Sequence, residues 1–195
     1  MNKISKKYEL WLGVAALAGC TSVADMVGYD TAALNEGAER NYTQVVQKAR
    51  SQNALDVSSP TAQRVHRVFF RLVPYANRAN RTGMPFNWQM NVIRSNDLNA
   101  WAMPGGKMAV YTGMVERLQL TDDEIAAVIG HEMTHALLEH SKKAIGGQVL
   151  TGLGGSILAS STGVDGDLVG LGADLLATKP FSRHQESEAD AGGVR

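Results

Sequence analysis

The sequence predicts an α+β domain in which a small sheet is followed by one buried helix. Three observations predict this class. Apolar residues recur at helical spacing from residue 60 to 73, short extended runs fill 87–112, and an almost continuous apolar stretch covers 125–138. The chain is long enough for one such domain with a real core, because it has 195 residues, of which 44% are hydrophobic.

The balance of charge argues against one class of function. The chain carries 19 basic and 19 acidic residues, so its formal net charge is zero, and it contains no block of Lys or Arg. A dedicated nucleic-acid-binding domain usually presents a basic surface. We therefore expect no nucleic-acid partner.

Residues 1–19 have the organisation of an export signal. Lys3, Lys6 and Lys7 form a positive region, and the apolar stretch 10–18 follows them. This stretch is too short to span a bilayer comfortably. It ends at Leu-Ala-Gly-Cys, which resembles the lipobox of bacterial lipoprotein signal peptides.

Cys20 is accordingly the predicted lipidation site, and its lipid would tether the protein to a membrane of the bacterial cell envelope. It is the only cysteine, so an internal disulfide is excluded although export implies an oxidising compartment. Thr21 stands where an Asp would resemble an inner-membrane retention signal, which favours the outer membrane, facing the periplasm. An ordinary cleaved signal peptide and an uncleaved anchor are the alternatives.

The segment 20–53 is predicted to be a tether followed by an amphipathic helix, ahead of the main domain at 54–195. The main domain opens with a helix, because Ser59 suits the N-cap and Pro60 the first helical position. Pro74 is expected to kink or end this helix.

Three extended runs are predicted as strands, at 87–95, 99–103 and 108–112, and a short helix is expected at 113–118. The second run consists of Asn99, Ala100, Trp101, Ala102 and Met103. If it lies at the edge of the sheet, its free amides and carbonyls could pair with an extended peptide. An internal strand without such a role is the alternative.

The next helix has clear boundary signals. Thr121 and Glu124 form a capping box, and an acidic first turn suits the positive end of the helix dipole. Lys142 and Lys143 are expected at the other end, where positive charge is favoured. Gly130 weakens the helix by about 1 kcal/mol relative to Ala. We therefore expect another backbone to pass close to Gly130.

Within this helix, residues 131–135 read His-Glu-Met-Thr-His. Because one helical turn takes 3.6 residues, His131 and His135 share a face and can bind one metal ion. Glu132 would be close enough to touch a metal-bound water. The alternative is a core helix whose histidines only find hydrogen-bond partners, but such a cluster would leave several buried polar groups to satisfy.

A catalytic zinc site needs a third protein ligand and an open position. A third His six residues after the second, as in metzincins, is absent, because that position is Ser141. His140 would lie about 500° around a continuous helix from His135. We therefore expect it to point away from the metal, as a structural residue or as a support for a ligand.

The acidic segment 186–190 is the expected source of that third ligand. Glu186 and Asp190 are four residues apart and share a face of a helix. One of them can bind the metal while the other accepts a hydrogen bond from a ligating imidazole. Glu188 is expected to point elsewhere, into solvent. An acidic helix start without a metal role is the alternative.

Three motifs together resemble one protein family. They begin at Asn99 (Asn-Ala-Trp-Ala-Met-Pro-Gly-Gly), Gly130 (Gly-His-Glu-Met-Thr-His) and Phe181 (Phe-Ser-Arg-His-Gln-Glu-Ser-Glu-Ala-Asp). The combination is similar to the zinc metallopeptidases that include the CAAX prenyl protease and HtpX, and the lipobox adds a likeness to their periplasmic lipoprotein branch, typified by LoiP. The resemblance covers about 54–190 and implies a zincin-like metallopeptidase fold, with strand 99–103 bordering the cleft.

The resemblance also implies roles for single residues. His131, His135 and Glu186 would bind one Zn2+ per chain. Glu132 would act as the catalytic base, and Asp190 would hold a ligand in position.

The activity implied is zinc-dependent hydrolysis of peptide bonds in misfolded or unassembled envelope proteins. Protein or peptide substrates, the membrane through Cys20, and other envelope proteins would be the partners. A zinc-binding but inactive chaperone or assembly factor is the alternative, and a purely structural lipoprotein would require the motifs to be accidental. Family members continue beyond the acidic segment, so the chain is expected to be short at its C-terminus.

The Gly-rich segment 144–176 is expected to form flexible helices and a loop over the active site, able to move for substrate entry. A membrane span within 144–162 is the alternative. It is disfavoured by Gln148 and by repeated Gly, Ser and Thr.

Overall fold

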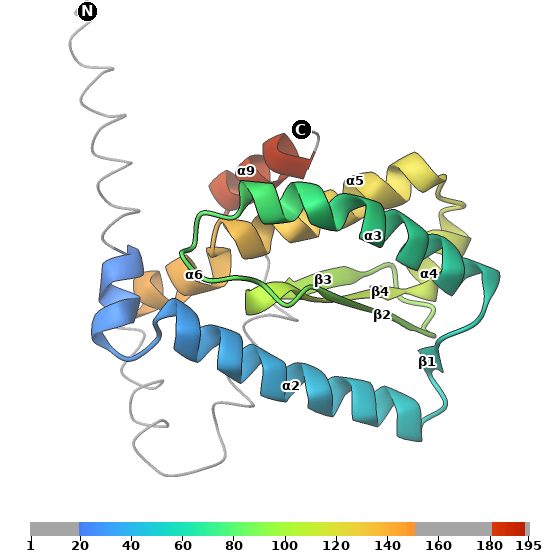
Figure 1. Cartoon of the computed structure of the whole chain (residues 1–195), viewed down its shortest axis with the longest axis horizontal. Helices are drawn as coiled ribbons and strands as arrows, with labels where there is room; N and C mark the ends of the chain where they lie inside the picture. Colours follow the sequence, from blue (N-terminus) through green and yellow to red (C-terminus); the bar gives the residue numbers. More distant parts are fainter. Residues whose placement is uncertain (1–19, 151–180, 194–195) are drawn as a thin grey trace, which may run out of the picture.

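The computed structural model describes residues 20–150 and 181–193 of the chain. Its body has three layers, with one long helix below a sheet and a group of helices above it (Figure 1). The helices are α2 (Thr31–Ser51), α3 (Pro60–Ala79), α4 (Thr112–Arg117), α5 (Asp122–Leu137), α6 (His140–Leu150) and α9 (Arg183–Gly193). The strands are β1 (Leu55–Asp56), β2 (Gln89–Ile93), β3 (Ala100–Met103) and β4 (Lys107–Tyr111), and the 3-10 turn η1 (Pro104–Gly106) joins β3 to β4.

The sheet is mixed and has the order β1-β2-β4-β3. β2 and β4 run parallel at its centre, with Met90 opposite Met108, and β1 and β3 pair antiparallel at its two sides. The second extended run of the sequence therefore lies at an edge of the sheet. The predicted combination of helices with a small sheet is observed.

One face of the sheet packs against α3 and α5. Ser59 caps α3 by accepting a hydrogen bond from the Ala62 amide at 3.1 Å, as predicted. Pro74 does not end α3, which continues for five more residues to Ala79. Residues on both sides of the proline, Phe69 and Ala76, are buried in the same core cluster, so packing holds the helix together across it.

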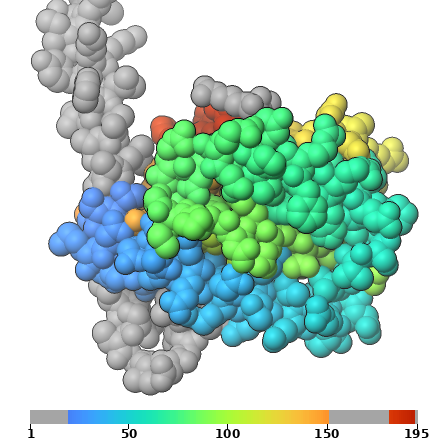
Figure 2. All heavy atoms as spheres, in the orientation of Figure 1, coloured from blue at the N-terminus to red at the C-terminus, as the bar shows by residue number. Residues whose placement is uncertain are grey.

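The other face of the sheet packs against α2. The Tyr42 hydroxyl donates to the Met108 carbonyl at 2.8 Å and accepts from the Asn91 amide at 2.7 Å. The Tyr42 ring meets Trp101 edge-on, with centroids 6.1 Å apart. The helical part of segment 20–53 thus belongs to the packed body, and Figure 2 shows α2, in blue, along its lower side.

The helix that carries the His-Glu-Met-Thr-His motif begins as predicted. The Thr121 amide donates to the Glu124 carboxylate at 2.7 Å, and the Thr121 hydroxyl accepts from the Glu124 amide at 3.3 Å. This reciprocal capping fixes the start of α5 at Asp122.

The end of that helix was predicted wrongly. Glu139 has a φ of 52°, which a right-handed helix does not accommodate, and a new helix starts at His140. Lys142 and Lys143 therefore belong to α6 and do not lie at the C-terminal end of α5. Lys142 is buried, and its ammonium pairs with Asp25 at 2.7 Å.

A short helical segment at residues 20–26 rests on α6. Ala24 and Ile145 are buried in one small cluster between the two. The backbone of Cys20 lies so close to Gly146 that a Cβ at Gly146 would collide with it. The predicted lipidation site is therefore next to α6.

Two sequence predictions fall mainly outside the described residues. They are the signal peptide at 1–19 and the Gly-rich segment, of which only 144–150 is described, as part of α6. Within the described parts of the chain, no helix combines the length and the apolar character that a membrane crossing needs.

Candidate metal centre

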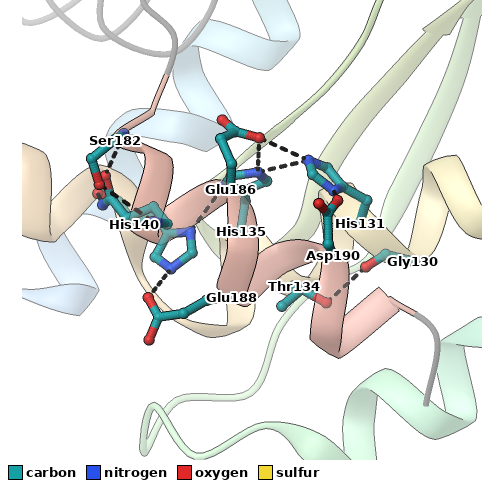
Figure 3. A network of polar contacts seen from close by, with 10 residues as sticks. Gly130, His131, Thr134, His135, His140, Ser182, Glu186, Glu188 and Asp190 are labelled. Atoms are coloured by element: carbon teal, nitrogen blue, oxygen red, sulfur yellow. Dashed lines mark hydrogen bonds and ion pairs between the residues drawn. The ribbon is translucent and has the colours of Figure 1, made fainter.

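Two helices meet at the candidate site. α5 presents His131 and His135 from one face, with their Nε2 atoms 3.0 Å apart. Glu186 comes from α9, and its Oε2 lies 3.3 Å from the His131 Nε2 and 3.7 Å from the His135 Nε2. Figure 3 shows these three side chains converging, although they are far apart in the sequence. They are the only group of potential metal ligands found among the described residues.

α9 approaches α5 closely because two glycines face each other where the helices cross. A Cβ on Gly130 would lie 2.8 Å from the Gly193 carbonyl oxygen, and a Cβ on Gly193 would lie 2.7 Å from the His131 amide nitrogen. Neither position has room for a side chain. The backbone expected near Gly130 from the sequence is thus the last turn of α9.

Asp190 holds the imidazole of His131 from the side away from the centre. Its Oδ1 lies 2.9 Å from the His131 Nδ1. A carboxylate only accepts, so the Nδ1 carries the proton and donates, which leaves the His131 Nε2 with a free lone pair. Helical spacing left open which carboxylate would bind a metal and which would support a ligand, whereas the family resemblance implied Glu186 for the first role and Asp190 for the second. In the structure Glu186 faces both Nε2 atoms and Asp190 faces the far nitrogen of one ring.

His140 was expected to point away from the metal face, as a structural residue or as a support for a ligand; its direction differs from that expectation, and its contact agrees with the support role. Its Nδ1 lies 2.8 Å from the Nδ1 of His135, and its own side chain is fully buried. The expectation assumed a continuous helix. The break at Glu139 turns the chain, so that His140 returns toward the buried side of His135.

Glu188 points elsewhere than Glu186, as expected, but its partly exposed carboxylate binds protein groups and not solvent alone. Its Oε2 lies 3.2 Å from the His140 Nε2 and 3.3 Å from the Nδ1 of His184. On a helix it sits two residues from Glu186, so spacing alone placed it on another face. It reaches a partner there because α6 brings His140 to that face.

Two further side chains of this region were missed by the sequence reasoning. Phe181 stacks on the His135 ring, with centroids 4.2 Å apart and planes 20° from parallel. Gln185 is buried and donates to the His140 carbonyl at 3.1 Å. Phe181 and Gln185 both precede Glu186 in the third motif, but no periodicity distinguishes them from ordinary helix-start residues.

Burial determines the protonation state of the His135 and His140 rings. Desolvation, followed by the charges of His140 and His131, lowers the pKa of His135 to about 3. Desolvation also lowers the pKa of His140 to about 4, with Lys143 acting in the same direction and Glu188 in the opposite one. Both rings are therefore neutral at pH 7, the form in which an imidazole binds a metal.

Glu132 lies on the side of α5 that faces β3. Its carboxylate accepts a hydrogen bond from the Ala102 amide. Burial, and next the charge of Glu186, raise the pKa of Glu132 to about 8, against the smaller effect of that amide. A divalent cation nearby would lower this pKa again. Glu132 can therefore take up a proton near neutral pH, as a general base must.

The donor set fits a zinc ion. Two imidazole nitrogens and one carboxylate oxygen are the three protein ligands of one established kind of catalytic zinc site, in which a water takes the fourth position. Zinc–nitrogen distances are about 2.0–2.1 Å, so one ion can contact two Nε2 atoms that lie 3.0 Å apart. In addition, a hydrogen-bonding group engages the Nδ1 of each ring, as second partners of metal-bound histidines do.

Comparison with known proteins points to the same chemistry. The model of a family described as peptidase family M48 matches residues 59–195. Metalloprotease LoiP of Escherichia coli is 38% identical over 126 residues, which cover 62% of this chain and 48% of LoiP. Metalloprotease YcaL of the same organism is 33% identical over 115 residues, covering 57% of this chain and 44% of YcaL.

A eukaryotic relative shows the same similarity. The mitochondrial metalloendopeptidase OMA1 of Schizosaccharomyces pombe is 30% identical over 135 residues, which cover 69% of this chain and 38% of OMA1. The chain thus spans less than half the length of each of these three relatives.

Proposed function

The chain belongs to peptidase family M48, and we propose that it is a zinc-dependent metalloendopeptidase. One observation carries the proposal. His131, His135 and Glu186 bring two imidazole nitrogens and a carboxylate oxygen within 4.8 Å of one another, and the charge of Glu186 is near enough to help raise the pKa of the Glu132 carboxyl. Similarity to LoiP and YcaL, both metalloproteases by name, supports the same activity.

Different residues would have different roles in peptide hydrolysis. His131, His135 and Glu186 would hold the ion, and Asp190 keeps the proton of His131 on its outer nitrogen. When bound, zinc supplies Lewis acidity, which activates a water and polarises the scissile carbonyl. The Glu132 carboxylate would accept the proton of that water and pass it to the leaving amine.

The edge strand β3 is the proposed binding site for the substrate backbone. Among the described residues β3 pairs with β4 alone, and its Ala102 amide donates to Glu132. An extended peptide added along this edge would bring its carbonyls next to the centre. Asn99 and the residues of β3 would contribute backbone groups, whereas the Trp101 and Met103 side chains are buried and support the strand from behind.

We further propose that the protein is anchored by a lipid on Cys20 in the bacterial outer membrane, facing the periplasm. Its substrates would be misfolded or unassembled envelope proteins. The lipobox at residues 17–20 supports the anchor. Incorporation of labelled palmitate should disappear in a Cys20→Ala variant. Retained labelling would contradict the anchor.

Proteolysis is tested by cleavage of an unfolded protein such as casein. We expect cleavage that a chelator abolishes and that added zinc restores. A protein that binds zinc stoichiometrically but never cleaves would instead support the alternative, an inactive chaperone or assembly factor.

A Glu132→Gln variant tests the general base. The amide cannot accept the proton, so turnover should fall by about 10²–10⁴-fold. Zinc content should stay unchanged, because Glu132 is not one of the three proposed ligands. Metal analysis and casein cleavage on the same preparation measure both quantities. Wild-type activity in this variant would refute the assigned role.

A further inference from the structure

We infer that His140 and Glu188 are positioning residues, which fix the proton of His135 on its Nδ1 and aim its Nε2 at the metal. The inference rests on the proposed zinc site. It extends that site by a relay of hydrogen bonds that runs from the partly exposed carboxylate of Glu188 through two buried imidazoles to the site of the ion.

The relay is continuous in the structure. Glu188 Oε2 lies 3.2 Å from the His140 Nε2, and the His140 Nδ1 lies 2.8 Å from the His135 Nδ1. The His135 Nε2 then faces the centre, 3.0 Å from the Nε2 of His131. Figure 3 shows these contacts as a line that leads from Glu188 to the site.

The direction of the hydrogen bonds follows from the chemistry of the end groups. A carboxylate can only accept, so the His140 Nε2 carries a proton and donates it to Glu188. The Nδ1 of a neutral His140 is then an acceptor. Two acceptors or two N–H groups cannot form a bond at 2.8 Å, so the His135 Nδ1 must donate. Its Nε2 keeps a lone pair, as a metal ligand requires.

The surroundings leave His135 little freedom to adopt another arrangement. His140 has no exposed surface, and His135 is 4% exposed. Phe181 covers one face of the His135 ring, and Gln185 binds the His140 backbone. Because water has almost no access to the two Nδ1 atoms, no solvent molecule can replace His140 without a cavity being made for it.

One helix, α9, thus supplies three carboxylates to the centre, and each has a different position. Glu186 faces the two Nε2 atoms, Asp190 holds His131, and Glu188 holds His135 through His140. α9 therefore contributes more than the third ligand. It also sets the orientation of both imidazole ligands.

The experiment compares zinc affinity and histidine tautomers in five proteins, the wild type, His140→Phe, Glu188→Ala, Glu188→Gln and His184→Ala. His140→Phe keeps an aromatic ring but removes the acceptor, and Glu188→Ala removes the end of the relay. His184→Ala is the matched control, because His184 also touches Glu188 but is 64% exposed and lies outside the relay. Zinc dissociation constants come from competition with a chromophoric chelator, and tautomers from 15N NMR of the metal-free proteins.

We expect zinc affinity to fall by about 10–100-fold in His140→Phe and Glu188→Ala, and the His135 Nδ1–H signal to weaken in both. Glu188→Gln should restore most of the affinity, because its amide oxygen can still accept from His140. His184→Ala should behave as the wild type. If His140→Phe does not fold, Glu188→Ala carries the test, because it removes only a partly exposed side chain.

Wild-type affinity and tautomers in Glu188→Ala would overturn the inference, as would a loss of thermal stability without any change in zinc binding. Failure of the wild-type protein itself to bind zinc would overturn the proposed function instead. The two failures are therefore distinguishable.

Discussion

Around His131 the imidazole is held by one exposed carboxylate, whereas around His135 it is held by a buried set of groups. Asp190 has a side chain that is 76% exposed, while His140, which occupies the equivalent position on His135, is fully buried. The outer half of the centre, His131 with Asp190, depends on a helix crossing that fits only glycine. The inner half, His135 with His140 and Glu188, depends on the break between α5 and α6 at Glu139. Two chemically identical candidate ligands are thus positioned by different means, one by a carboxylate 59 residues away on a crossing helix and one by an imidazole five residues away, beyond a helix break.

The largest expected effect comes from separating the two helices. Gly130→Val would place a side chain against the Gly193 carbonyl and push α9 away from α5. All contacts of Glu186 and Asp190 with the histidines should then be lost, and zinc binding and cleavage with them. The same change at Gly37, in α2, meets no atom within 4 Å and should leave zinc binding intact. Stoichiometric zinc in Gly130→Val would show that the close crossing is not needed.

The next largest effect is expected from the third ligand alone. Glu186→Ala removes the carboxylate that faces both imidazoles. It leaves the contacts of Asp190 with His131 and of His140 with His135 in place. Zinc content after dialysis should fall well below one ion per chain, while the thermal midpoint of the metal-free protein should change little. Zinc content equal to that of the wild type would exclude Glu186 as a ligand.

A smaller effect on zinc affinity is expected from removing Asp190, the exposed carboxylate that holds His131. Asp190→Ala leaves the His131 Nδ1 open to water, which can accept the same hydrogen bond. Zinc affinity should therefore fall only by about 10-fold, the lower end of the range for such supports. The comparison between the halves predicts a larger loss in His140→Phe, measured by the same chelator competition. The opposite ranking would contradict the distinction drawn between them.

A further effect, on the stability of the metal-free protein and not on zinc affinity, is a pH dependence that arises from His135 and His140. Unfolded histidine has a pKa of about 6.5, whereas His135 and His140 in the folded protein have pKa values of about 3 and about 4. Below pH 6.5 the unfolded chain binds more protons than the folded one, so acid favours unfolding. The contribution of the two rings to the stability of the metal-free protein is complete above this pH and declines below it, by up to about 1.4 kcal/mol per pH unit for each ring. Glu132, whose pKa is raised to about 8, contributes in the opposite direction in the wild type and in the variant alike.

Urea unfolding of the chelated protein at pH 7, 6 and 5 measures this decline. The slope should be smaller in His140→Phe, because one of the two buried rings is gone. Equal slopes in the variant and the wild type would show that the inner rings do not cause the dependence.

Much of the fold was predictable because its signals are local. The cap at Ser59 and the capping box at Thr121 each use side chains within three residues of the helix start, and both are observed. The three predicted strands overlap β2, β3 and β4, since extended runs bounded by turn residues are also local patterns. The break at Glu139 was not predictable, because a non-glycine residue with positive φ carries no clear signal in one sequence.

The sequence by itself determined the chemistry of the centre. The spacing of His131 and His135 puts them on one helical face, and the spacing of Glu186 and Asp190 does the same on another helix, because helical periodicity is a property of the local chain. Only the tertiary structure decided which nitrogen each carboxylate faces, which ring His140 supports, and that Glu188 takes part. Those assignments depend on where α5 ends and how closely α9 crosses it, and contacts between distant segments set both.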